Sequence, residues 1–216
     1  MTSVTLVSVN VLLPELLGMH RGQPVESGIA KRPVTQDSLW LGPTNLEGDG
    51  QADLSVHGGP DKAVYAYPSE HLPVWSAELG QELGPAAFGE NLTTAGATED
   101  DVFIGDRWSW GDAVLEVCQP RSPCFKLAMH RGRGDIGRRF RESGRSGWYL
   151  RVLAEGRVPV AGPIEVVERH PMGATVRLVH EAARPGGAPA EVLEALLLVD
   201  PLADEWKMKL AARLWG

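Results

Sequence analysis

The sequence predicts a mainly β protein with added helices (α+β), in which a closed β-barrel or sandwich is followed by a small three-helix bundle. Up to residue 168, short apolar segments alternate with Gly, Pro, Asn and Asp at the close spacing that is typical of barrels. After His170 the apolar residues recur at helical spacing instead. This change of pattern predicts a β-barrel domain over residues 1–170 and a three-helix domain over residues 171–216.

The predicted strands are short, and a tight turn at Gly111-Asp112, with its first residue at positive φ, is expected to join two of them. Two helices interrupt the strands. One follows the N-cap Ser69 and runs to Leu79, and the other follows Asp135 and reaches Ser143. The strands are expected at Val4–Asn10, Gly28–Val34, Ala63–Tyr67, Glu90–Thr93, Arg107–Trp110, Ala113–Cys118, Gly147–Leu153 and Ile164–Glu168.

Three helices are predicted in the tail, and breaks at Pro185–Gly187 and Asp200-Pro201 separate them. Asp200 is the expected N-cap of the last helix, with Pro201 at its first position. A bundle this small buries too little apolar surface to be stable alone, so it should pack on the main domain. The expected helices are Thr175–Ala183, Pro189–Leu198 and Pro201–Leu214.

Composition limits the classes of function. The chain has 216 residues, is 43% apolar, and carries a net charge of −7. No window is long and apolar enough for a bilayer, and the N-terminus lacks a signal peptide pattern. We therefore expect a cytoplasmic protein without a membrane or nucleic-acid partner. The loops are nevertheless locally basic, which favours a small anionic ligand.

The two cysteines differ in their surroundings. Two thiols cannot build a disulfide framework, a four-thiolate zinc site or an iron–sulfur cluster. Cys118 lies inside a strand and is expected to be a buried structural residue. Cys124 follows that strand within a proline-rich segment, between Arg121 and Lys126. Because nearby cations favour the thiolate, Cys124 is a candidate nucleophile or metal ligand.

Other polar residues lie in loops that could hold an anion. Two glycines stand between His57 and Lys62, where free backbone amides could face a ligand, although a simple tight turn explains the same pattern. Asn91 could supply directed hydrogen bonds or sit in a structural turn. Most arginines after residue 130 fit a solvated helix face, and Arg145 fits a binding turn best. The candidate binding residues are Lys31, Arg32, His57, Gly58, Gly59, Lys62, Asn91, Arg121 and Arg145.

Several motifs occur in one order along nearly the whole chain, and together they resemble the MOSC superfamily, named for the molybdenum cofactor sulfurase C-terminal domain. The resemblance is strongest to the YiiM-like branch, in which a three-helix domain follows the MOSC domain. The motifs are Ser27–Lys31, Gly48–Gln51, Val56–Ala63, Phe88–Leu92, Gln119–Lys126 and Ser146–Tyr149.

The resemblance implies a MOSC-type β-barrel that binds the molybdenum cofactor (molybdopterin), with Cys124 as the protein ligand to molybdenum. It further implies a detoxifying reduction of N-hydroxylated compounds, such as 6-hydroxylaminopurine to adenine, with electrons from an external flavoprotein. The basic residues would then hold the cofactor, and His57 or Asn91 would orient the substrate or move protons.

Two other functions fit the same residues. Cys124 could hold a persulfide and pass sulfur to a metal centre, or the chain could bind the cofactor without catalysis. The tail is shorter than is usual for the branch, which leaves the docking of the donor and a possible homodimer open.

Overall fold

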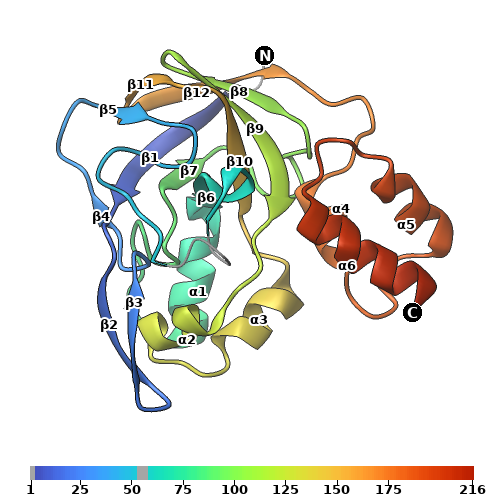
Figure 1. Ribbon diagram of the computed structural model, residues 1–216, viewed down its shortest axis with the longest axis horizontal. Coiled ribbons are helices and arrows are strands. Elements are labelled where there is room, and N and C mark those ends of the chain that lie inside the picture. Colours follow the sequence, from blue (N-terminus) through green and yellow to red (C-terminus); the bar gives the residue numbers. More distant parts are fainter. Residues whose placement is uncertain (1–2, 53–57) are drawn as a thin grey trace.

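The computed structural model describes residues 3–52 and 58–216, and it confirms the predicted mixed β and helical fold (Figure 1). Seven strands close into a barrel in the order β12-β8-β9-β10-β6-β7-β1, because β12 also pairs with β1. Among the described strands, only β6 and β7 pair in parallel. The barrel strands are β1 (Ser3–Val11), β6 (Val64–Pro68), β7 (Leu92–Ala95), β8 (Arg107–Trp110), β9 (Ala113–Pro120), β10 (Trp148–Ala154) and β12 (Gly162–Glu168). The β8–β9 turn is as predicted, with Gly111 at φ 58°.

Five short strands lie outside this ring: β2 (Glu15–His20), β3 (Gln23–Ser27), β4 (Arg32–Pro33), β5 (Ser38–Leu41) and β11 (Gly156–Pro159). β2 and β3 form a separate hairpin that projects from the barrel (Figure 1). The predicted strand Gly28–Val34 is therefore wrong over most of its length. A Cβ atom at Gly28 would lie 2.5 Å from the Gly50 carbonyl oxygen, so the backbone here packs tightly against a loop instead of pairing.

Helices cover one end of the barrel: η1 (Pro60–Lys62), η2 (Ser69–His71), α1 (Leu72–Leu79), α2 (Phe125–Arg131) and α3 (Ile136–Ser143). α1 and α3 confirm predictions, whereas α2 was not predicted. Ser69 is the first residue of η2 and not the N-cap of α1. Trp75, Phe88 and Phe140 form a second, largely aromatic core beneath these helices.

The tail folds into α4 (Val176–Ala182), α5 (Ala190–Leu197) and α6 (Asp204–Trp215). Thr175, expected as the first residue of this helix, is the N-cap of α4, and its side chain accepts a hydrogen bond from the Leu178 amide. The last helix begins at Asp204, after a turn that contains Asp200 and Pro201, so this predicted start is wrong. Trp206 shares one hydrophobic core with barrel residues, and the helices therefore pack on the barrel as expected.

A buried carboxylate, Glu99, ties α4 to the barrel end. Glu99 accepts hydrogen bonds from the Gly147 amide and the His71 ring, each at 2.7 Å. Burial alone would raise the pKa of Glu99, but these bonds outweigh it and hold the pKa below its usual value. Arg177 of α4 lies 3.7 Å from Glu99 and also donates to the Ser143 carbonyl. None of the helices in the described part of the chain is long and apolar enough to cross a membrane.

Candidate functional site

A pocket of roughly 660 Å³, including the open space at its mouth, lies where three connections meet at the barrel end. Its walls come from loops within residues 27–31 and 49–52, from the 121–126 connection between β9 and α2, and from strands β6 and β10. The close backbone contact between Gly28 and Gly50 brings the first two loops together. Among the described residues, the lining contains four cations, Lys31, Lys62, Arg121 and Lys126, and one carboxylate, Asp49. The pocket is therefore suited to an anion.

Of the two cysteines, Cys124 lies in this pocket. It is the N-cap residue of α2, with extended backbone angles (φ −110°, ψ 174°), and is partly exposed. Cys118 is fully buried, and its Sγ lies 3.3 and 3.4 Å from the carbonyl oxygens of Asp61 and Tyr149. Burial raises the pKa of Cys118, so this thiol stays protonated. The structural prediction for Cys118 is confirmed, and Cys124 is the thiol that a pocket ligand can reach.

Arg121 is buried beside Cys124 and has an unused donor. Its guanidinium lies over the Tyr65 ring at 4.9 Å and near the Phe140 ring at 5.4 Å. Burial opposes its charge, but the neighbouring Tyr65, Tyr149 and Cys124 groups outweigh burial and raise the pKa of Arg121. Nη1 finds no hydrogen-bond partner within residues 3–52 and 58–216. A buried donor without a partner is costly, so this atom indicates an acceptor on a ligand.

Lys31 and Asp49 form a buried ion pair in the pocket wall. Asp49 also accepts hydrogen bonds from the Leu12 amide at 3.0 Å and from Asn91 Nδ2 at 2.9 Å. Burial lowers the pKa of Lys31, although the charge of Asp49 acts in the opposite direction. Because one of its three N–H groups bonds to Asp49, the ammonium retains donors for the pocket.

Asn91 lies at the pocket as predicted, but its amide is already engaged. Oδ1 accepts from the Tyr65 amide at 3.0 Å, while Nδ2 donates to Asp49 and to the Asn10 carbonyl. This geometry suits Asn91 to positioning Asp49 and not to orienting a substrate. The neighbouring Glu90 is fully buried and absent from the lining.

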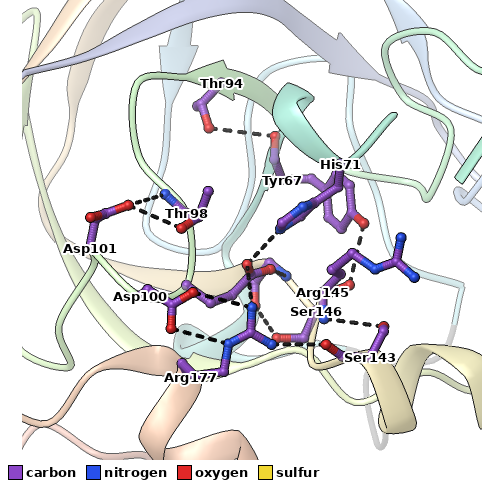
Figure 2. A network of polar contacts seen from close by, with 12 residues as sticks. Tyr67, His71, Thr94, Thr98, Asp100, Asp101, Ser143, Arg145, Ser146 and Arg177 are labelled. Atoms are coloured by element: carbon purple, nitrogen blue, oxygen red, sulfur yellow. Dashed lines mark hydrogen bonds and ion pairs between the residues drawn. The ribbon is translucent and has the colours of Figure 1, made fainter. Parts of the chain in front are cut away.

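Two predicted binding arginines lie elsewhere. Arg32 is exposed and pairs with Glu15 at 3.3 Å. Arg145 stacks over the Trp75 ring at 4.0 Å and pairs with Glu78 at 2.6 Å. Figure 2 shows the Arg145 backbone carbonyl accepting the hydrogen bond of Tyr67 while its side chain extends away. Neither arginine lines the pocket.

Of the described residues of the predicted glycine turn, only Lys62 lines the main pocket, and the two glycines lie outside it. Gly58 and Gly59 line a separate shallow hollow, which touches the pocket through the shared Lys62. Lys62 also pairs with Glu205 of α6 at 2.8 Å, which links the C-terminal helices to the site. His57 lies outside the described residues.

Tyr65, Tyr149, Asp49 and Lys126 line the pocket without having been selected from the sequence as binding residues. The flanking glycines at 48 and 50 are a signal for Asp49, since a carboxylate between two glycines sits where a backbone approaches closely. Lys126 shares its short segment with Cys124. The tyrosines resemble ordinary strand residues, and no local signal distinguishes them.

His130, in α2, makes the fold sensitive to acid. Its Nε2 is buried without a partner among the described residues. Burial first, and then the charges of Arg131 and Arg121, lower its pKa from 6.5 to about 4. The unfolded chain therefore takes up this proton first, so the stability from the neutral ring is complete above pH 6.5 and is lost as the pH falls toward 4.

We expect the free energy of unfolding to fall by about 1–2 kcal/mol from this group over that range, after allowance for the partial exposure of the ring. Urea unfolding at several pH values between 7 and 4 measures it. The His130→Asn variant should show a flatter dependence. If the free energy of unfolding depends on pH equally in wild type and His130→Asn, then His130 is not the cause of the acid sensitivity.

The sequence model of the MOSC domain family matches residues 53–165, which is more than half of the chain. This chain therefore belongs to the MOSC domain family. Within that family it is YiiM-like. It is 42% identical to protein YiiM of Escherichia coli over 165 residues, which is 74% of this chain and 72% of that protein. It is 41% identical to the uncharacterized protein YflK of Bacillus subtilis over 203 residues, 94% of this chain and 91% of YflK. The crystal structure of YiiM from Geobacillus stearothermophilus superimposes with a TM-score of 0.82 at 32% identity, over 98% of this chain and 99% of that one.

A fungal relative is larger. A protein of Gibberella moniliformis named reductase is 40% identical over 135 residues, which is 61% of this chain but only 24% of the fungal protein. The match covers a segment of that reductase, and this chain has the size of the YiiM and YflK proteins instead.

Proposed function

We propose that this chain binds the molybdenum cofactor and uses it to reduce N-hydroxylated bases and related N-hydroxylated compounds. The observation that supports this most is the unpartnered Nη1 of buried Arg121, next to a reachable thiol in a pocket with four cations. The membership of the MOSC family, which is associated with this cofactor, supports the binding. The fungal relative named reductase supports the type of reaction.

The residues present fit the cofactor. It is a flat, anionic pterin with a phosphate, and it brings its own sulfur ligands to the metal. Cys124 would add one thiolate, a soft ligand that suits such a metal. Arg121 and Lys62 would neutralise the phosphate. The described residues contain no group of three His, Cys, Asp or Glu side chains that could hold a metal ion, which agrees with a single protein ligand.

When bound, the cofactor would supply a two-electron reduction. The reaction converts R–NH–OH, two electrons and two protons into R–NH₂ and water. Lys31 holds a proton at Nζ in the pocket wall, next to Asp49, and we assign it as the proton donor to the leaving oxygen. Asn91 keeps the Asp49 carboxylate in place. The chain has only two cysteines, so the electrons are proposed to come from an external flavoprotein.

The experiment is a reductase assay. The chain is purified from a host that makes the cofactor and from one that does not, and each preparation is given 6-hydroxylaminopurine and a reduced dye. We expect adenine to form only with the first preparation. Cofactor that is bound without any turnover would leave a storage role, and equal turnover in both preparations would contradict the proposal.

A further inference from the structure

The C-terminal helices reach the pocket through one carboxylate. Glu205 lies in the first turn of α6 and pairs with Lys62 Nζ at 2.8 Å and with Lys209 Nζ at 2.6 Å. Lys209 Nζ also donates to Ser122 Oγ at 2.8 Å. Both Lys62 and Ser122 line the pocket, and Ser122 stands two residues before Cys124. A chain of polar contacts therefore runs from one wall of the pocket, through α6, to another.

The barrel fixes the position of this carboxylate. The amide of Ala203, the N-cap residue of α6, donates to the Cys118 carbonyl of β9 at 3.0 Å. Trp206, the residue after Glu205, is 3% exposed and belongs to the core that the tail shares with the barrel. Because Glu205 lies between these two anchors, its backbone is held against the barrel, whereas the Lys62 ammonium sits at the end of a flexible side chain.

The charges of this group leave Lys62 positive for a ligand. Burial would raise the pKa of Glu205, but hydrogen bonds from Lys209 and Lys62 outweigh it and lower that pKa. The carboxylate is therefore ionised at neutral pH, and the two ammonium groups together leave one positive charge unbalanced. An ammonium has three N–H groups, so Lys62 can bond to Glu205 and to a ligand at once.

The exposure of the pair separates a positioning role from a structural one. The side chains of Lys62 and Glu205 are 22% and 38% exposed, and ion pairs at such positions add little to stability. An ordered Lys62, by contrast, has already lost the rotamer freedom that a ligand would otherwise have to restrict. The pair therefore matters more for the binding of an anion than for the fold.

We propose that Glu205 is a positioning residue, which holds the Lys62 ammonium at the pocket for the phosphate of the cofactor. Glu205 does not line the pocket and acts only through Lys62. This inference rests on the proposed function, in which Lys62 neutralises that phosphate, and it gives the C-terminal helices a part in the site.

Isothermal titration calorimetry with inorganic phosphate, on the cofactor-free chain, tests this role without any turnover. We expect the dissociation constant to rise about 3- to 10-fold in Glu205→Gln, because phosphate binding must then order Lys62. Asp204→Asn is the matched control and should keep the wild-type constant. It removes the same charge from the same helix turn, at a residue that lines neither the pocket nor the shallow hollow. An unchanged or lower constant in Glu205→Gln would overturn the inference.

A double variant tests whether Glu205 acts through Lys62. Lys62→Met alone should raise the dissociation constant for phosphate at least about tenfold, since a charge-assisted hydrogen bond is lost. Adding Glu205→Gln to Lys62→Met should then cause no further change, whereas residues that act independently have additive effects. Additive effects would overturn the inference, because α6 would then support the fold and not Lys62.

The outcomes separate this inference from the reductase function. Phosphate binding that depends on Glu205 and Lys62, in a chain that reduces no 6-hydroxylaminopurine, would contradict the reductase function alone. A wild-type chain that binds no phosphate would overturn the positioning role of Glu205, and the reductase assay would still decide the reaction.

Discussion

Replacing Asp49 with Ala is expected to lower the free energy of unfolding by about 3–5 kcal/mol. The reason is the buried ammonium of Lys31, which loses its counter-ion and cannot reach water easily. The substitution also removes the acceptor of the Leu12 amide and of Asn91 Nδ2. Urea unfolding followed by fluorescence measures the change at neutral pH.

The double variant Lys31→Met/Asp49→Ala separates the charge effect from the lost hydrogen bonds. It removes both charges, so it should recover a large part of the lost stability. Glu15→Ala breaks an exposed pair with Arg32 and should change stability by less than about 1 kcal/mol. If Asp49→Ala also changes the free energy of unfolding by less than about 1 kcal/mol, the ion pair between Lys31 and Asp49 does not stabilise the fold.

Replacing Cys124 with Ser is expected to lower reductase turnover by at least about 100-fold, since loss of even an outer-shell partner costs about 10–100-fold at metal sites. A serine hydroxyl is a harder and far less acidic ligand than a thiol, and it would not bind a sulfur-ligated metal well. The change is nearly isosteric in a partly exposed position, so the fold should survive.

The matched control is Cys118→Ser, the same substitution at a buried thiol outside the pocket. The new hydroxyl can still donate to the Asp61 or Tyr149 carbonyl, as the thiol does. We expect this variant to keep wild-type turnover per folded molecule, measured with 6-hydroxylaminopurine. A Cys124→Ser enzyme that stays as active as Cys118→Ser would remove Cys124 from the reaction.

Local patterns were sufficient to predict the barrel strands, and they singled out Cys124, which the structure places in the pocket. The β8–β9 hairpin was predictable because Gly111 marks its turn, and Cys124 because Arg121 and Lys126 flank it. The β2–β3 hairpin and α2 were missed. The hairpin residues are mostly exposed on both faces, so they lack the alternation of a half-buried strand. α2 has only seven residues, too few for a clear helical period.

The pairing of site residues was not predictable, because it depends on barrel closure. Lys31 and Asp49 meet only where two loops pack through Gly28 and Gly50. Charge alone could not separate Arg121 from Arg145: the first is buried in the pocket, whereas the second finds Glu78 and an aromatic ring elsewhere.

Molybdenum and pterin content, measured in wild type beside Cys124→Ser and Cys118→Ser from a cofactor-competent host, tests the central proposal most directly. We expect about one molybdenum per chain in wild type and Cys118→Ser, and less than about a tenth of that in Cys124→Ser, because the single protein thiolate is lost. Equal molybdenum in all three proteins would contradict the role of Cys124. A wild-type protein with no molybdenum but with sulfane sulfur on Cys124 would instead identify a sulfur carrier.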